Sequence, residues 1–207
     1  MVSRKSCSDP LDADSLDADS LVPDSLDARR SVPAKQLDEP APEPAVLLRI
    51  LRSAVRVPDH GKRIPFRFIR IAGDTRIALG EFLVQRALEL DPDASTSVLD
   101  KDRGRFSHAP LVLVVVAKLG HDEKIPESER LSTAACVCFA LLIAVQQHGF
   151  GAQWLTGWPA YDIEVMRKLG LDSEETIAGF IHIGTPKLQA AERERPNPAT
   201  LLTDLRL

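Results

Sequence analysis

The feature that most constrains the fold is a run of aliphatic residues, Leu-Val-Leu-Val-Val-Val-Ala, at positions 111–117. A strand with one face in water alternates apolar and polar residues, whereas a strand buried on both faces is a continuous apolar run rich in β-branched residues. We therefore expect residues 111–117 to form the central strand of a sheet that is covered on both sides.

The segments around this strand alternate between helical and strand patterns. Apolar residues recur at helical spacing from Leu47 to Val55, and Pro58 forbids continuation of that helix. Gly149 and Gly170 fit the left-handed caps that end helices. The sequence predicts helices at 47–55, from an N-cap at Thr75 to about Leu90, at 127–148 and at 162–169, with further strands at 66–71, 152–155 and 176–184. This order predicts the α+β class, with a central mixed β-sheet flanked by helices.

The beginning of the chain carries a degenerate five-residue repeat that places leucine at positions 11, 16, 21 and 26. Leucines five residues apart drift by about 140° around a helix, so they form no single buried stripe. Because the repeat is also rich in aspartate, we expect residues 1–24 to be a disordered acidic tail and residues 25–207 to be one domain. Such a tail is either a leader without function or an arm that docks a partner.

Charge and composition exclude several classes of partner. With 26 Lys and Arg against 30 Asp and Glu, the formal charge is −4, which disfavours nucleic acid and anionic membranes as partners. The longest nearly apolar stretch, residues 134–145, is shorter than the roughly 20 residues of a membrane span and predicts a buried helix. Aspartate-rich sequence follows Arg4 and Lys5 where a signal peptide would be apolar, so we expect a cytoplasmic protein.

The sequence offers few side chains for catalysis by the protein alone. Residues 149–154 begin like a dinucleotide fingerprint but carry Trp154 at the third glycine position, and phosphate-loop, zinc-protease and hydrolase motifs are absent. Cys136 or Cys138 with His108 or His148 could form a nucleophile and base, but both cysteines lie in an apolar run typical of packed free thiols. The spacing of the cysteines suits no metal site either. We therefore expect a cofactor to supply the chemistry.

An ordered set of short motifs covers nearly the whole predicted domain. It comprises Arg29-Arg30-Ser31, Arg56 with Pro58-Asp59-His60, Phe66 and Phe68, Gly149-Phe150-Gly151 before Trp154-Leu155-Thr156, Gly179-Phe180, and Gly184-Thr185-Pro186. This set resembles the nitroreductase family of FMN enzymes, close to its compact single-domain bacterial branch. Three positions depart from the family: Ile64-Pro65-Phe66 replaces Gln-Pro-Trp, Leu155 stands where a basic residue is frequent, and Val32-Pro33 replaces a polar pair after Ser31.

The resemblance implies a homodimer with FMN at the subunit interface. Arg29, Arg30 and Ser31 would hold the FMN phosphate and ribityl chain, Trp154, Leu155 and Thr156 would lie along the flavin ring, and Arg56 and His60 would reach the flavin from the other subunit. A run of arginine donors and a hydroxyl suits a phosphate of about −2 charge. Lys187, Arg193 and Arg195 either add a phosphate contact or form a solvated basic tail.

The same resemblance implies the reaction. Hydride would pass from NADH or NADPH to the flavin, and a nitroaromatic, quinone or similar small-molecule acceptor would then take the electrons by a ping-pong mechanism, with no catalytic side chain. The alternative, motivated by Phe66 and Leu155, is a flavin-binding or interaction protein whose catalytic site has decayed.

Overall fold

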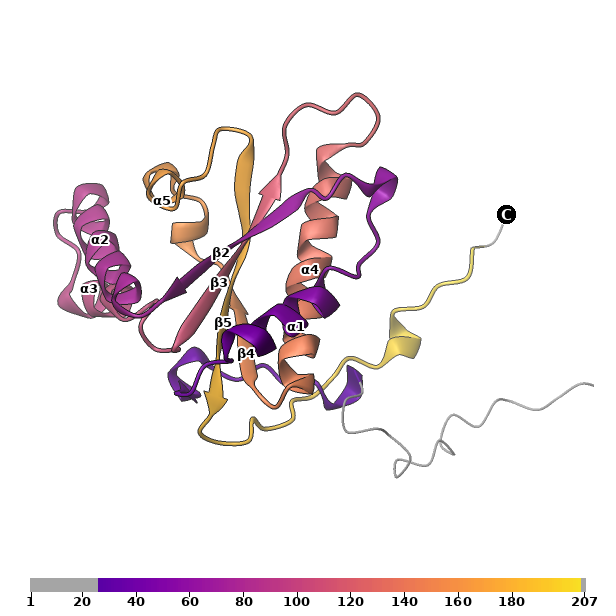
Figure 1. The fold of residues 1–207 in the computed structure, drawn as a ribbon, viewed down its shortest axis with the longest axis horizontal. Helices are drawn as coiled ribbons and strands as arrows, with labels where there is room; N and C mark the ends of the chain where they lie inside the picture. The colour runs from indigo at the N-terminus through magenta and orange to yellow at the C-terminus, as the bar shows by residue number, and fades with distance from the viewer. Residues whose placement is uncertain (1–25, 206–207) are drawn as a thin grey trace, which may run out of the picture.

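The computed structural model describes residues 26–205, so the predicted acidic tail at 1–24 lies outside the described residues. Five helices and five strands make up the described fold (Figure 1). The helices are α1 (Pro44–Ala54), α2 (Asp74–Leu90), α3 (Thr96–Arg103), α4 (Glu127–Gln147) and α5 (Ile163–Lys168). The strands are β1 (Leu37–Asp38), β2 (Phe66–Ala72), β3 (Leu111–Lys118), β4 (Gly151–Leu155) and β5 (Glu175–Pro186). Short 3-10 turns, among them η3 (Ala34–Gln36) and η4 (His60–Lys62), complete the connections.

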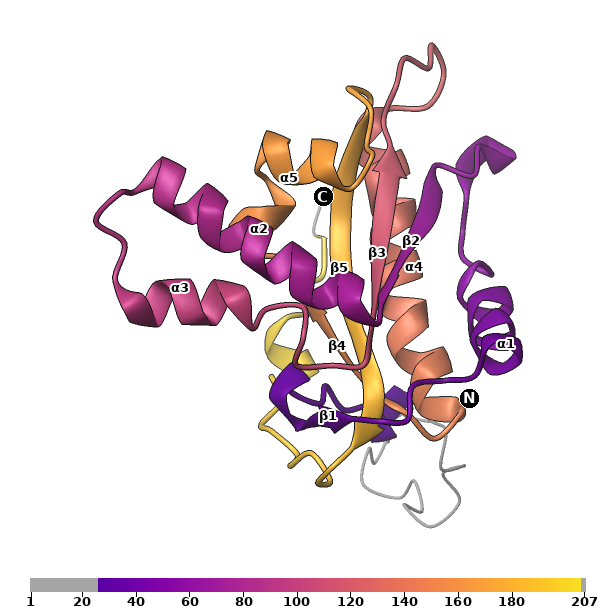
Figure 2. The ribbon, with the colours of Figure 1, turned by 60° about the vertical axis from the view of Figure 1, so that its left-hand side comes forward.

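The predicted central strand is confirmed, and its two faces belong to different layers. Leu111, Leu113, Val115 and Ala117 pack in one buried cluster with α1 and α4. Val112, Val114 and Val116 pack in a second cluster with α2 and α5. Figures 1 and 2 accordingly show α1 and α4 on one side of the sheet and α2, α3 and α5 on the other. The continuous apolar run is therefore explained by burial on both faces.

The expectation of a mixed sheet is wrong for the described strands, because every pair among them is antiparallel. Helix α4 does carry the chain from β3 to β4, and these two strands run parallel to each other. However, β5 lies between them and pairs antiparallel with both. Helices α2 and α3 connect β2 to β3, and these two strands are antiparallel neighbours. A strand that arrives late in the sequence thus separates the two that a crossover helix would otherwise bring together.

Most predicted helix ends agree with the structure. The glycines that follow α4 and α5 have left-handed backbone, with φ of +80° at Gly149 and +75° at Gly170. The predicted cap at Thr75 is wrong, because α2 begins at Asp74 and no side chain caps its first turn. Helix α3 and strand β1 were not predicted, since a short polar helix and a two-residue strand carry no apolar periodicity.

Helix α4 is long and apolar enough to cross a membrane by length and composition, but half of that apolar window is buried inside the fold. Val137, Cys138, Leu141 and Val145 are fully buried beneath the sheet, which confirms the prediction of a core helix. Burial raises the pKa of the Cys138 thiol to about 12, so this thiol is no nucleophile near neutral pH. Cys136, two residues earlier, is exposed, so the expectation that it is packed in the core is wrong.

Candidate active site

The first predicted motif, Arg29-Arg30-Ser31, is fixed at the C-terminal end of α4. The amide N–H of Arg30 donates to Oε1 of Gln146 at 3.0 Å, and Nε2 of Gln146 donates to the Ala28 carbonyl at 3.0 Å. The next amide, that of Val32, donates to the Ala152 carbonyl in β4 at 2.9 Å. The backbone on both flanks of the motif is therefore anchored, to the Gln146 side chain on one flank and to β4 on the other.

Four arginines gather at this end of the molecule. Arg30 forms an ion pair with Glu192, and Nη2 of Arg195 lies 3.0 Å from the same carboxylate. Partial burial lowers the pKa of Arg29, and the charges of Arg195, Arg193 and Arg30 lower it further. We call Arg29, Arg30, Arg193 and Arg195 the arginine cluster. Its carboxylate neighbours are Glu192 and Asp27, so positive charge is in excess and an anion would be stabilised here.

The basic C-terminal residues lie in different places. The chain after β5 returns to the N-terminal motif and places Arg195 in one cavity with Arg29. Lys187 instead lies 3.2 Å from the Asp38 carboxylate, at the pairing of β1 with β5. Arg195 thus borders the same cavity as Arg29, while Lys187 is held elsewhere.

Of the predicted triplet, Trp154 and Leu155 lie in β4 on opposite faces of the sheet, and Thr156 follows the end of the strand. Trp154 packs against the α4 side, where Nε1 donates to the Ala178 carbonyl at 3.2 Å and the indole covers Gly179. A Cβ at Gly179 would lie 2.1 Å from Nε1, so only glycine permits this contact. Leu155 points the other way and lines a cavity of about 350 Å³. Alternation along the strand therefore gives Trp154 and Leu155 different surroundings.

The cavity beside Leu155 is basic, and sequence analysis did not assign it. We call it the basic cavity; it is lined by Pro33, Ala34, Lys35, Lys101, Arg105, His108, Gln153 and Leu155. Arg105 is held by Asp102, with Nη2 and Oδ1 2.7 Å apart, and buried Asp102 also accepts from Nε1 of Trp158 at 3.1 Å. Partial burial and the charge of Lys35 lower the pKa of His108. No local pattern could reveal this cavity, because three separate segments supply its walls.

The segment 31–35 connects the arginine cluster to the basic cavity. It follows β4, since the Val32 amide binds the Ala152 carbonyl and the Ala34 amide donates to Oε1 of Gln153 at 2.7 Å. Nη1 of Arg29 donates to the Ser31 hydroxyl at 3.2 Å, which directs this hydroxyl toward the arginine cluster. An anion site and a partly apolar cavity therefore lie at the two ends of one short segment.

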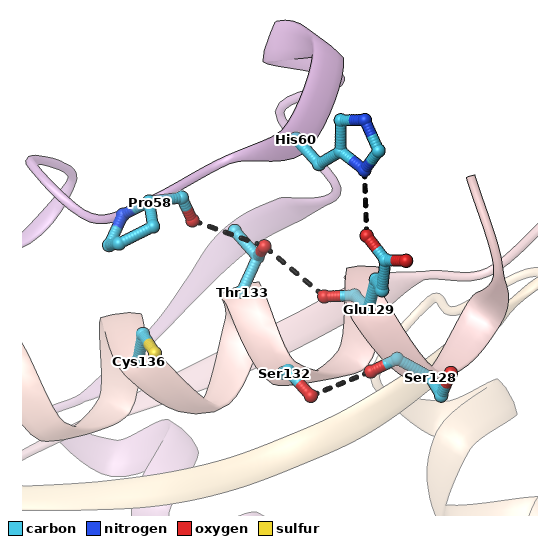
Figure 3. A pocket seen from close by; sticks show the side chains of 7 residues that line it. All are labelled: Pro58, His60, Ser128, Glu129, Ser132, Thr133 and Cys136. Carbon is cyan, nitrogen blue, oxygen red and sulfur yellow. Dashed lines mark hydrogen bonds and ion pairs between the residues drawn. The ribbon is translucent and has the colours of Figure 1, made fainter. Parts of the chain in front are cut away.

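The second predicted motif lies at the opposite, N-terminal end of α4. Nδ1 of His60 is 2.7 Å from Oε2 of Glu129, and both side chains border a cavity of about 320 Å³ along α4 (Figure 3). The Thr133 hydroxyl donates to the Pro58 carbonyl at 3.2 Å and so fastens the loop to the helix (Figure 3). Arg56 precedes this loop and is exposed.

The two predicted motifs cannot share one ligand within a single chain. His60 contacts Glu129 and Arg30 contacts Gln146, and these partners are 17 positions apart on α4, from 129 to 146. At 1.5 Å per residue, this corresponds to about 25 Å along the helix axis, which exceeds the length of a flavin nucleotide.

A family comparison decides how this site is interpreted. The family described as "Nitroreductase family" has a sequence profile that matches residues 26–185 of this chain. The chain belongs to the nitroreductase family. The predictions of this family, of an oxidoreductase and of the α+β nitroreductase-like fold are thereby confirmed.

Individual relatives of this nitroreductase agree with the family assignment. It is 35% identical over 176 residues to "Putative NAD(P)H nitroreductase YdjA" of Escherichia coli K12, covering 84% of this chain and 94% of the relative. It is 32% identical over 161 residues to a similarly named protein of Haemophilus influenzae, covering 77% and 86%.

Solved structures share the fold at lower identity. A nitroreductase-like protein of Bacillus cereus superposes with a TM-score of 0.72 at 20% identity, covering 86% of this chain and 91% of that one. A nitroreductase of Bacteroides fragilis, solved with bound FMN, superposes with a TM-score of 0.63 at 19% identity, covering 86% and 95%.

Proposed function

We propose that this nitroreductase binds FMN between two copies of the chain and transfers electrons from NADH or NADPH to a nitroaromatic, quinone or similar small-molecule acceptor. One observation carries the proposal: the arginine cluster and the basic cavity lie at the two ends of the short segment 31–35. An elongated molecule with a phosphate at one end and a flat ring system at the other matches this arrangement.

The residues present fit the cofactor. Arg29, Arg30, Ser31 and Arg195 would hold the phosphate, because guanidinium groups and a hydroxyl form charge-assisted hydrogen bonds with it. The Glu192 carboxylate now pairs with the same arginines, which supports the view that they accept an oxyanion. Leu155 would border the ring, while Trp154 and Thr156 would place it through the backbone of β4 and the turn that follows. When bound, FMN supplies the group that accepts and releases hydride.

A dimer would complete the site. Cys136 and Phe139 are exposed on one face of α4 and Leu131 is exposed beside it, with exposed fractions of 40% for Leu131 and 41% for Phe139. Exposed apolar side chains gathered on a core helix are typical of an interface between chains. In a twofold dimer with α4 packed antiparallel near Cys136, His60 of the partner subunit would approach the end of α4 that holds Arg30. This arrangement supports the prediction that Arg56 and His60 act on the flavin of the other subunit.

The departures from the family do not support a decayed site. Phe66 is buried in the α1 and α4 cluster, with its ring 6.0 Å from that of Phe68, so its ring serves packing. Leu155 leaves an apolar wall on which a ring system can pack. The enzyme is therefore the better-supported reading, and a flavin-binding protein without turnover is its alternative.

The test is spectroscopic. The purified full-length protein, reconstituted with FMN, should lose its flavin absorbance when NADH or NADPH is added without oxygen and regain it when a quinone follows. A flavin-loaded protein that neither nucleotide reduces would favour the alternative. A protein that binds no FMN would contradict both.

A further inference from the structure

We infer that Glu192 is an internal competitor of the flavin phosphate: its carboxylate occupies the arginine cluster and must leave it when FMN binds. Glu192 thereby sets how tightly the chain holds FMN. The inference rests on the proposed function, because it names a residue that controls cofactor binding at that site.

The Glu192 carboxylate bridges two arginines from opposite ends of the described chain. Oε2 forms an ion pair with Nη2 of Arg30, and Oε1 accepts from Nε and Nη2 of Arg195 at 3.1 and 3.0 Å. Oε1 also accepts from the Arg193 amide at 3.0 Å. This amide, and then the charges of Arg30 and Arg195, lower the pKa of Glu192, so the carboxylate is ionised near neutral pH. Each carboxylate oxygen thus meets a guanidinium, as two oxygens of a phosphate would.

The same carboxylate lies inside the proposed phosphate site. Glu192 lines a cavity of about 360 Å³ together with Arg29 and Arg195. A phosphate that contacts these arginines would lie beside the carboxylate in one cavity, where the two negative charges repel each other. The phosphate and the Glu192 carboxylate therefore compete for the same guanidinium groups.

Few other contacts fasten Glu192 to the domain. Within residues 26–205, the last backbone hydrogen bond before Glu192 that joins the C-terminal segment to another part of the chain runs from the Lys187 amide to the Gln36 carbonyl, at 2.9 Å. Ala190 is partly buried, and residues 191–200 are exposed. Ion pairs between exposed side chains are weak, so a phosphate, which carries more charge than a carboxylate, can replace Glu192.

The first measurement compares Glu192→Gln with Glu194→Gln. Glu194 is exposed on the same segment and forms no ion pair within residues 26–205, so its substitution removes the same charge without the contact. In fluorescence titrations of the flavin-free, full-length protein, FMN should bind about fivefold more tightly to Glu192→Gln, because two exposed ion pairs no longer compete. Glu194→Gln should stay within about twofold of the wild type, since a charge without contact is screened by salt. Riboflavin, which lacks the phosphate, should bind all three proteins equally.

The second measurement determines the rates of binding by stopped-flow fluorescence. The association rate constant for FMN should rise about fivefold in Glu192→Gln while the dissociation rate constant stays the same, because more of the free protein is ready to bind. Unchanged or weaker FMN binding in Glu192→Gln would overturn the inference, and so would an equal gain in Glu194→Gln or with riboflavin. A gain confined to slower dissociation would show that Glu192 stays beside the bound phosphate, and would overturn its displacement.

Inorganic phosphate separates this inference from the proposed function. Calorimetric titration with inorganic phosphate should also show binding about fivefold tighter in Glu192→Gln than in the wild type. Equal phosphate binding by the two proteins would overturn the inference. The expected gain in a protein that binds no FMN would support the competition for the arginine cluster and contradict the proposed function alone.

Discussion

At the scale of single residues, Arg30 has the most direct test. Its guanidinium contacts Glu192 and donates to the Asp27 carbonyl at 2.7 Å, so it lies at the centre of the arginine cluster. Arg30→Ala should weaken FMN binding at least tenfold, since a hydrogen bond to a charged group contributes about 1.5–3 kcal/mol. Fluorescence titration measures the loss, and circular dichroism should show a folded protein. Arg49→Ala, on the exposed side of α1, is the control, and equal FMN affinity in both variants would exclude Arg30 from the phosphate site.

A second residue, His182, makes stability depend on pH. It is buried in β5, with its ring parallel to Phe106, and Nδ1 has no partner in the described structure. Burial, with smaller effects from the charges of His108 and Arg105, lowers its pKa from 6.5 to about 4. Between these values the unfolded chain binds a proton that the folded chain does not, so stability falls as the pH drops from 6.5 toward 4.

The size of this pH effect can be measured by urea unfolding. When the pH falls from 7.5 to 5.0, the buried His182 should lower the free energy of unfolding by about 2 kcal/mol. His182→Leu should lack that part of the pH dependence, whereas His121→Leu, at an exposed loop position, should retain it. An identical pH dependence in wild type and His182→Leu would show that His182 does not stay neutral in the folded state.

At the scale of elements, α4 has two roles on its two sides. One side is core, and the other presents Leu131, Cys136 and Phe139 to the surface. Phe139→Glu places a charge in the proposed interface and should raise the dimer dissociation constant by roughly 100-fold, equivalent to about 3 kcal/mol. Flavin should be lost together with the dimer, which light scattering and flavin absorbance follow in one chromatographic run. Ile77→Glu, on the opposite layer, is the control, and a Phe139→Glu monomer that retains FMN would refute a shared site.

At the scale of the whole molecule, the flavin that we propose to lie between two chains would restrict the order of events. If both substrates stack on one face of the flavin, the nicotinamide must leave before the acceptor enters. Initial rates at several fixed acceptor concentrations should therefore give parallel double-reciprocal lines. Intersecting lines would instead require a ternary complex with separate sites for the two substrates.

The sequence by itself determined the features that depend on local pattern. Burial on both faces leaves a continuous aliphatic run, so the central strand at 111–117 was identifiable, and left-handed backbone after a helix requires residues such as Gly149 and Gly170. The family was recognisable because its short motifs keep their order along the chain.

The tertiary structure alone decided which distant segments meet. It placed β5 between β3 and β4, returned Arg195 to Arg29, and gathered Lys35, Lys101 and Leu155 around one cavity. It also separated Cys136 from Cys138, which share the same apolar run but lie on opposite sides of α4. These outcomes depend on how whole layers pack against each other, and residue periodicity reports only whether a side chain faces some layer, not which one.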